Sequence, residues 1–255
     1  MMLFDSHAHY EDERFDCDRD ALLSSMSAQN VGWIVNVGCD PSGAQTAVRL
    51  AERYPFVYAA IGVHPQSAGD VTDEQIIALE TLYSHPKVVA VGEIGLDYHY
   101  ENTTRERQKD VFIRQLETAA RLNLPVCIHN REAHADTLDV LRAFRGVRGV
   151  LHSYSGSLEM AKELLKLGFV FSFSGIITFK NAKRCVPIIA YLPSDAILIE
   201  TDCPYLAPEP MRGRRCDSSF LRYTCARLAE IRGISFQQAA ELTTQNAKRL
   251  YGISE

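Results

Sequence analysis

The sequence predicts an α/β protein with a closed (β/α)8 barrel, the TIM barrel, and one additional C-terminal helix. Short runs rich in Val, Ile and Phe alternate with longer segments of helical periodicity, and this alternation predicts a parallel sheet. Eight such strand–helix units fill the 255 residues, which is the size expected of this barrel. Alternation alone does not distinguish a closed sheet from an open one, so an open, doubly wound sheet is the alternative.

The expected strands are apolar runs whose composition fits burial on both faces. They cover residues 2–7, 32–37, 57–63, 88–94, 125–129, 149–153, 169–174 and 196–201. The expected helices cover residues 16–30, 41–54, 72–84, 103–122, 133–144, 158–167, 182–191, 217–232 and 236–251. Thr72, with Gln75 three residues later, resembles a capping box and marks a helix start. Because no polar or low-complexity linker divides the chain, we expect one domain over residues 1–255.

Composition is that of a globular protein with ample material for a core, since 46% of the residues are hydrophobic and 23% are charged. No apolar run approaches the ~20 residues of a membrane span, and the N-terminus shows no secretory signal pattern. The seven cysteines form no C-x-x-C pair, which is typical of a reduced, cytoplasmic protein. A net charge of −5 does not favour general nucleic-acid binding, although a local patch can still bind it.

Two histidines stand at the end of the first expected strand, in Phe4-Asp5-Ser6-His7-Ala8-His9. In extended chain, alternate side chains share one face, which places His7 and His9 roughly 6.5 Å apart along the strand. Imidazole is the commonest protein ligand for transition metals. The pair is therefore a candidate for half of a metal site, with two unrelated strand-end histidines as the alternative.

Further polar residues stand at the ends of the other expected strands, where a barrel of this kind carries its chemistry. In chain order they are Asn36, His64, Glu93, His129, His152 and Asp202. Together with the first pair, the sequence predicts six metal ligands, which are His7, His9, Glu93, His129, His152 and Asp202.

The carboxylates in this set have distinct expected roles. Glu93 follows an apolar run, where a lone carboxylate is costly unless it is paired or binds metal, and Arg131 is the one candidate partner nearby. Its two oxygens can bridge two cations. Asp202 is expected to bind metal and to accept the proton of the attacking water. Glu200 shares the face of Asp202 and is expected to orient a ligand histidine or to be a buried structural acid.

Six motifs resemble the TatD-type deoxyribonucleases in order and spacing. They are D-S-H-A-H, G-V-H-P, G-E-I-G-L-D, C-I-H-N-R, L-H-S-Y-S-G and E-T-D-C-P-Y-L, between Phe4 and Leu206. The resemblance implies a TIM barrel with a one- or two-metal centre that cleaves phosphodiester bonds, often as a 3′-to-5′ exonuclease on DNA. Residues 212–219 depart from the family's Gly-x-Arg-Asn-x-Pro segment, because the arginine is retained but the Asn and Pro are not.

The resemblance also implies how the ligands are shared. His7, His9, Glu93 and Asp202 would hold one ion, and Glu93, His129 and His152 would hold the other, with Glu93 as the bridge. His64 of G-V-H-P would lie near the substrate phosphate. No lysine stands at an expected strand end, which agrees with a glutamate bridge rather than a carbamylated lysine.

The expected function is hydrolysis of DNA phosphodiester bonds by a metal-activated water, with Asp202 and Glu93 as catalytic residues. Two divalent cations, Zn²⁺, Mn²⁺ or Mg²⁺, would lie ~3.5–4 Å apart. Arg131 and Arg212 are expected phosphate contacts, since guanidinium pairs with phosphate in two-pronged fashion. The expected partner is DNA or another phosphodiester, with no membrane, and the expected state is a monomer. The alternatives are hydrolysis of a small amide or lactone, and a non-catalytic, metal-stabilised barrel.

Overall fold

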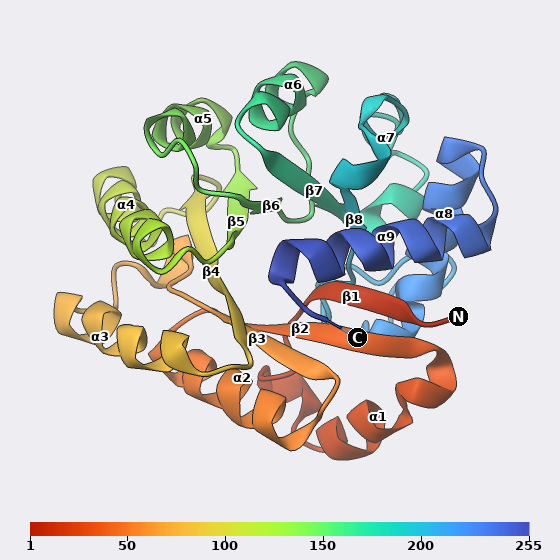
Figure 1. The fold of residues 1–255 in the computed structure, drawn as a ribbon, viewed down its shortest axis with the longest axis horizontal. Coiled ribbons are helices and arrows are strands. Elements are labelled where there is room, and N and C mark those ends of the chain that lie inside the picture. Colours follow the sequence, from red (N-terminus) through yellow and green to blue (C-terminus); the bar gives the residue numbers. More distant parts are fainter. Residues whose placement is uncertain (255) are drawn as a thin grey trace.

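The computed structural model describes residues 1–254, and within them eight parallel strands form a barrel with helices packed around its outside (Figure 1). Sequential neighbours pair from β1 to β8, and a parallel bridge between Ala8 and Cys203 joins the segment after β8 to the end of β1. A doubly wound sheet reverses its strand order partway, and this sheet does not. The predicted (β/α)8 barrel is confirmed, and the open-sheet alternative is wrong.

Strands and helices alternate as the sequence predicts. The strands are β1 (Leu3–Ala8), β2 (Val31–Gly38), β3 (Val57–Ile61), β4 (Val88–Asp97), β5 (Val126–Arg131), β6 (Gly149–Leu151), β7 (Phe169–Phe173) and β8 (Ile197–Ile199). The helices are α1 (Arg19–Ser25), α2 (Pro41–Arg53), α3 (Asp73–Ala78), α4 (Arg105–Leu122), α5 (His134–Ala143), α6 (Leu158–Lys166), α7 (Cys185–Tyr191), α8 (Leu221–Arg232) and α9 (Phe236–Tyr251). Across residues 1–254, no helix is long and apolar enough to cross a bilayer.

Several helix boundaries differ from the prediction. The helix predicted at 72–84 is α-helical only to Ala78 and continues as a 3-10 helix, and the helix predicted at 182–191 begins at Cys185. Two further boundaries differ for local reasons. The helix predicted at 16–30 is confined to α1, because a short 3-10 turn follows it and Asn30 then takes the left-handed conformation, with φ of 61°. The helix predicted at 217–232 begins later, at Leu221, because the Asp217 side chain accepts a hydrogen bond from the Ser219 backbone N–H and caps a separate 3-10 turn. The capping box at Thr72 forms with both of its hydrogen bonds, as predicted.

β4 and β5 extend beyond their predicted ends, and the added residues bring polar side chains into the sheet. They stay paired through Asp97 and Arg131, and Gly95 lies opposite His129. A Cβ at position 95 would lie 2.0 Å from the His129 carbonyl oxygen, and the backbone there has φ of +141°. Only glycine fits this close approach. It lets Glu93, Asp97 and His129 share one region of the barrel mouth.

The interior of the barrel changes from apolar at its base to polar at its mouth. Phe4, Val150 and Leu198, near the starts of their strands, form a buried cluster with Leu250 and Tyr251 of α9. α9 lies against β1 and β8 (Figure 1), and the Tyr251 hydroxyl donates a 3.0 Å hydrogen bond to the Ser6 carbonyl oxygen. Side chains two residues further along a strand face the same way. The positions that follow Val150 and Leu198 on this face are His152 and Glu200, so the polar layer rests on an apolar floor.

The segment that departs from the family motif docks against the first strand. The Ser218 hydroxyl donates a 2.6 Å hydrogen bond to Asp5 Oδ2, and the Thr201 hydroxyl donates another of 2.6 Å to the same oxygen. Ser218 also accepts a 2.9 Å hydrogen bond from the hydroxyl of Tyr10. Ser218 therefore helps to anchor the strand that carries two of the predicted metal ligands.

Asp5 makes the stability of the fold depend on pH. Burial raises the pKa of Asp5 to about 7, against the hydrogen bonds from Ser218 and Thr201 that lower it. A raised carboxyl pKa contributes stability that is fully present below about pH 4 and is lost as the pH rises through about 7. Between about pH 4 and pH 7, the free energy of unfolding should therefore fall by as much as about 4 kcal/mol less in Asp5→Asn than in the unmodified protein. Urea unfolding of the metal-free protein at several pH values measures it. An unchanged pH dependence in Asp5→Asn, matched to that of the exposed Asp139→Asn control, would contradict this expectation.

Candidate metal centre

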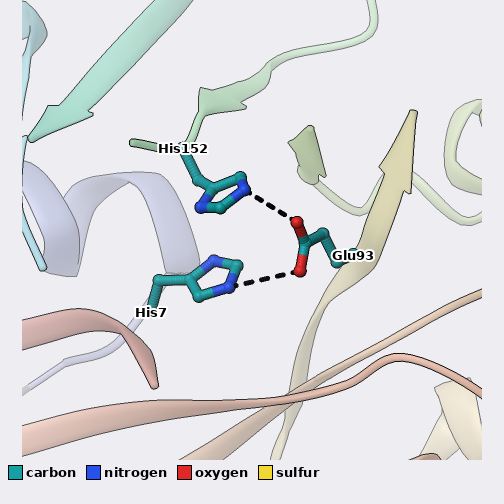
Figure 2. A group of neighbouring side chains, drawn as sticks. All are labelled: His7, Glu93 and His152. Carbon is teal, nitrogen blue, oxygen red and sulfur yellow. Dashed lines mark ion pairs between the residues drawn. The ribbon is translucent and has the colours of Figure 1, made fainter. Parts of the chain in front are cut away.

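Side chains from five strand ends meet at the mouth of the barrel, around the carboxylate of Glu93. Figure 2 shows Glu93 between His7 and His152, with one carboxylate oxygen directed at each histidine. Glu93 Oε2 lies 3.4 Å from His7 Nε2, and Glu93 Oε1 lies 2.7 Å from His152 Nε2. Glu93 is only 3% exposed. Its two oxygens therefore face two separate groups of side chains. The histidines pair with the carboxylate, and Arg131 is not required as its partner.

The first group combines β1 with the segment after β8. His7 Nε2 and His9 Nε2 are 3.0 Å apart, and Asp202 Oδ1 lies 3.4 Å from His9 Nε2 and 3.6 Å from His7 Nε2. Glu93 Oε2 completes the group at 3.7 Å from His9 Nε2. The backbone ties the two segments together, since the Asp202 N–H donates a 2.9 Å hydrogen bond to the His7 carbonyl oxygen. Asp202 takes the left-handed conformation, with φ of 57°, which is typical of strained functional positions.

The second group combines β4, β5 and β6. His129 Nδ1 lies 2.8 Å from Glu93 Oε1 and 3.2 Å from His152 Nε2. His64 Nε2 lies 3.6 Å from the same glutamate oxygen. His64, Glu93 and His129 also satisfy the distances of a metal-binding trio. His64 Nδ1 accepts a 3.1 Å hydrogen bond from the Gln66 backbone N–H, so the neutral ring carries its proton on Nε2, beside the second group.

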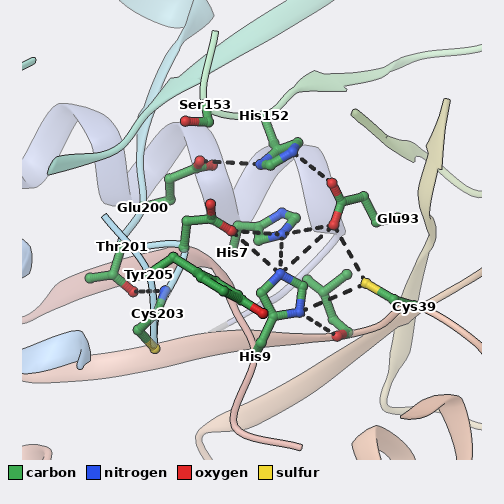
Figure 3. Close-up of polar contacts among 12 residues, drawn as sticks. His7, His9, Cys39, Glu93, His152, Ser153, Glu200, Thr201, Cys203 and Tyr205 are labelled. Atoms are coloured by element: carbon green, nitrogen blue, oxygen red, sulfur yellow. Dashed lines mark hydrogen bonds and ion pairs between the residues drawn. The ribbon is translucent and has the colours of Figure 1, made fainter. Parts of the chain in front are cut away.

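The far nitrogens of three of these histidines face oxygen acceptors, and Figure 3 shows Glu200 beside His152. His9 Nδ1 is 2.9 Å from the Val37 carbonyl oxygen and 3.0 Å from Glu11 Oε1. His129 Nε2 is 3.1 Å from Asp97 Oδ2, and His152 Nδ1 is 3.4 Å from Glu200 Oε1. Carboxylate and carbonyl acceptors of this kind fix the imidazole tautomer and make the facing nitrogen a stronger ligand.

This arrangement of donors fits a divalent cation. Because the far nitrogens of His9 and His129 act as donors, their near nitrogens carry lone pairs, and these face the lone pairs of His7, His152 and the carboxylates. Lone pairs held 3.0–3.2 Å apart repel one another unless a proton or a cation lies between them. His152 Nδ1 and Glu200 Oε1 lie 3.4 Å apart, and both are buried without a hydrogen-bond partner in residues 1–254. The nitrogen-rich set suits Zn²⁺ or Mn²⁺ by ligand softness.

The charges of the site perturb its titrating groups in opposite directions. Burial opposes the charged form of His152, but Glu93 and Glu200 together raise its pKa well above the usual range. Burial likewise opposes ionisation of Glu93, but His152, His64 and His7 hold its pKa well below the usual range. Burial acts on Asp202 in the same way, and contact with His9, His152 and His7 lowers its pKa. The carboxylates are therefore ionised at neutral pH, and without metal His152 favours the protonated form, whose proton a cation can replace.

The two arginines predicted to contact phosphate lie in different places. Arg131 lines a cleft of about 870 Å³ that opens over the centre, together with His64, Asp97 and Asp202. Arg212 stacks on Phe179, with its guanidinium carbon 3.9 Å from the ring centre, and is not among the cleft-lining residues. Its phosphate contact stays a prediction.

Three contacts escaped the sequence prediction. Glu11 holds His9, the thiol of Cys39 lies 3.5 Å from Glu93 Oε2, and the thiol of Cys127 lies 3.2 Å from His7 Nδ1. Cys127, expected to be a small apolar core residue, is buried but also contacts a ligand histidine. For Glu11 a signal existed, since it continues the alternation of His7 and His9 along the chain.

A barrel whose mouth gathers histidines and carboxylates around one glutamate defines the class of metal-dependent hydrolases. The chain matches the TatD related DNase family over residues 4–252 and belongs to it. The predicted family is confirmed.

Three relatives give the extent of the similarity. The chain is 43% identical to the uncharacterized metal-dependent hydrolase YabD of Bacillus subtilis, over 99% of this chain and 100% of the relative. It is 32% identical to the 3′-5′ ssDNA/RNA exonuclease TatD of Citrobacter rodentium, over 99% of this chain and 98% of that one. The crystal structure of YjjV, a TatD homologue from Escherichia coli, matches with a TM-score of 0.93 at 30% identity, over 99% of this chain and 98% of that one.

Asp97 offers a test of the histidine-holding contacts. It accepts hydrogen bonds from His129 at 3.1 Å and from Gln66 at 3.0 Å, and its side chain is fully buried. We expect Asp97→Asn to weaken metal binding by about 10- to 100-fold, because the amide orients and polarises His129 less well. Competition with a chromogenic chelator measures the affinity. Asp136→Asn, which alters an acid outside the centre, is the control, and equal affinities of the two variants would contradict the assignment.

Proposed function

We propose that the protein is a metal-dependent phosphodiesterase that acts on DNA as a 3′-to-5′ exonuclease and works as a monomer. The observation that carries this proposal is the division of the Glu93 carboxylate between two donor groups, at 2.7 Å and 3.4 Å, beneath an open cleft. Such a division is typical of two-cation sites that cleave phosphate esters. The name of the Citrobacter rodentium relative, an exonuclease, supports the choice of bond and substrate.

Two divalent cations would fit the two groups. His7, His9, Asp202 and Glu93 would hold one, and His129, His152 and Glu93 would hold the other. Bound there, such cations activate a water molecule and clamp the oxygens of a phosphate. The choice among Zn²⁺, Mn²⁺ and Mg²⁺ follows from the donors, since the nitrogen-rich groups favour the first two and phosphate chemistry commonly uses the third. Elemental analysis, followed by activity titration with each ion, decides among them.

The chain's own residues have separate tasks. Asp202 lies at the floor of the cleft with its side chain 15% exposed, so its carboxylate can accept the proton of an attacking water. His64 lines the same cleft beside Glu93 and can donate a hydrogen bond to a phosphate oxygen. Arg131, at the end of β5, supplies a positive charge at the rim. Together these groups bind and orient the phosphate and deprotonate the attacking water. One ester bond of the phosphodiester breaks, and the phosphate leaves as a monoester.

The test is hydrolysis of a single-stranded oligonucleotide by the His129→Ala and Asp202→Ala variants. We expect each to lose at least about 100-fold in kcat/KM, because one removes a ligand and the other a ligand and base. His134→Ala, an exposed histidine on α5, is the control. Undiminished activity in both site variants would contradict the proposal. Turnover of cyclic amides or lactones alone would favour the amidohydrolase alternative, and metal-dependent stability without any turnover would favour the non-catalytic one.

A further inference from the structure

Beyond the metal ligands, two exposed tyrosines stand on opposite sides of the cleft. Of the seven large hydrophobic side chains that are well exposed in residues 1–254, only Tyr100 and Tyr205 line the cleft, at 46% and 47% exposure. Tyr100 follows β4 and Tyr205 follows β8, and these strands are half a turn apart in the ring. The metal centre lies between them. Exposed aromatic rings at a functional cleft mark binding surfaces.

Tyr205 has acidic side chains near it, and the cation that lies over its ring is already paired. Its ring meets the edge of the His9 ring, with centroids 6.3 Å apart, and Figure 3 shows the two side by side. The guanidinium carbon of Arg14 is 4.1 Å from the ring centre, but Arg14 is already paired with Asp12 through hydrogen bonds of 2.9 Å and 2.7 Å. Asp40 lines the same side of the cleft. This side can hold a base, but it repels an additional phosphate.

Tyr100, in contrast, lies beside an arginine that has no acidic partner among residues 1–254. The guanidinium carbon of Arg131 is 5.1 Å from the centre of the Tyr100 ring, and Arg131 NH1 is 3.4 Å from its hydroxyl oxygen. Among residues 1–254, no carboxylate lies within ion-pair distance of Arg131, so its charge is available for an anion. This side can hold a base and a phosphate together.

We propose that Tyr100 and Tyr205 stack on the nucleobases that flank the cleaved phosphate of a single strand. The 3′-terminal nucleoside stacks on Tyr205, where the acidic side leaves no place for a further phosphate. The rest of the strand leaves over Tyr100, where Arg131 contacts the next phosphate. Stacking of this kind accepts any base, because every base has an aromatic face. This inference rests on the proposed function and adds the path and direction of the strand.

Kinetics of the Mn²⁺-loaded enzyme on a thymidine decanucleotide test the stacking. We expect Tyr100→Ala and Tyr205→Ala each to raise KM by about tenfold, within the range found for loss of a stacked base. Tyr100→Phe and Tyr205→Phe keep the ring and should stay within about twofold of the unmodified protein. Tyr191→Ala, which alters a tyrosine 51% exposed on α7 outside the cleft, is the matched control. Alanine variants with an unchanged KM would overturn the proposal.

A substrate without bases separates stacking from damage to the centre. Methyl 4-nitrophenyl phosphate is a phosphodiester too small to reach both tyrosines, so its turnover should stay within about twofold in all four tyrosine variants. An equal loss on this ester and on the decanucleotide would assign the tyrosines a structural role and overturn the proposal. If the unmodified protein hydrolyses this ester but no oligonucleotide, the DNA function itself fails. If it hydrolyses oligonucleotides and only the tyrosine effects are missing, the stacking alone fails.

The direction of the strand has its own readouts. Arg131→Ala should raise KM for the decanucleotide and reduce the dependence of log KM on log salt concentration by about one phosphate contact. It should raise KM for a dinucleoside monophosphate at least about fivefold less than for the decanucleotide, since the dinucleotide lacks the second phosphate. A 3′-phosphorylated decanucleotide should be hydrolysed at least about tenfold less efficiently than its 3′-hydroxyl form, because its end faces the acidic side. Equal rates for the 3′-phosphorylated and 3′-hydroxyl decanucleotides, or an equal Arg131→Ala effect on the dinucleotide and the decanucleotide, would overturn the assigned direction.

Discussion

Replacement of Glu93 by glutamine is expected to remove both cations and to lower kcat/KM by about 10³-fold or more. The carboxylate contributes one oxygen to each donor group and is buried, so the neutral amide can satisfy at most one of them. The substitution also removes a negative charge between His152 and His7, so less negative charge remains to balance that of a cation. A 10³-fold loss corresponds to about 4 kcal/mol of transition-state stabilisation, a magnitude fitting for the loss of metal catalysis.

Metal content and rate are the two measurements for Glu93→Gln. Elemental analysis after dialysis gives the ions per chain, and the decanucleotide assay gives kcat/KM. Glu52→Gln is the control, because Glu52 pairs with His85 on the outer helices and contacts none of the ligands. If Glu93→Gln keeps the full metal content and rate of the unmodified protein, the bridging role of Glu93 is wrong. Retention of one ion with loss of activity would support a two-cation mechanism with unequal sites.

Stabilisation by metal is expected to grow as the pH rises from about 6 to about 8.5. The pKa of His152 is raised, with Glu93 and Glu200 overcoming the effect of burial, and Cys39, Glu11 and Asp202 do the same for the pKa of His9. In the metal-free protein, a raised imidazole pKa contributes stability below the unfolded pKa of about 6.5 that is lost as the pH rises through the folded pKa. A cation replaces those protons and restores the missing positive charge.

As the pH rises from about 6 to about 8.5, we expect the Tm of the metal-free protein to fall and the Tm of the metal-loaded protein to change less. Metal affinity should rise by as much as about tenfold per pH unit for each proton released. Calorimetry in two buffers of different ionisation enthalpy counts those protons. A gain in Tm on metal addition that is larger at pH 6 than at pH 8.5 would contradict the expected charge balance. The Asp97→Asn variant offers a check, since it leaves His9 and His152 unaltered.

The barrel and its strand ends were predictable because they depend on patterns that short segments carry. Apolar runs that end in a histidine, as in the stretch before His129, mark both a buried strand and a residue at its mouth. The same reasoning found Asp202 and Glu93, and the structure brings them together with the histidines. The resemblance in six motifs then supplied how the donors are divided, which strand periodicity alone cannot give.

The remaining contacts could not be predicted because they depend on the closure of the ring and on loop geometry. Cys127 meets His7 only because β5 faces β1 across the barrel interior. The turn that carries Arg212 leaves the eighth strand and packs on Phe179, and no local pattern indicates this partner. The extension of β4 to Asp97 depends on the close approach at Gly95, which a glycine in a strand suggests but does not locate.

The cover that α9 forms over the base of the barrel has a consequence for biosynthesis. The Tyr251 hydroxyl bonds to the backbone of Ser6, so β1, with His7 and His9, is supported by a residue 245 positions away from Ser6 in the chain. The two predicted ligands of β1 therefore gain this support only after the segment that contains Tyr251 has been made and has packed against the strand.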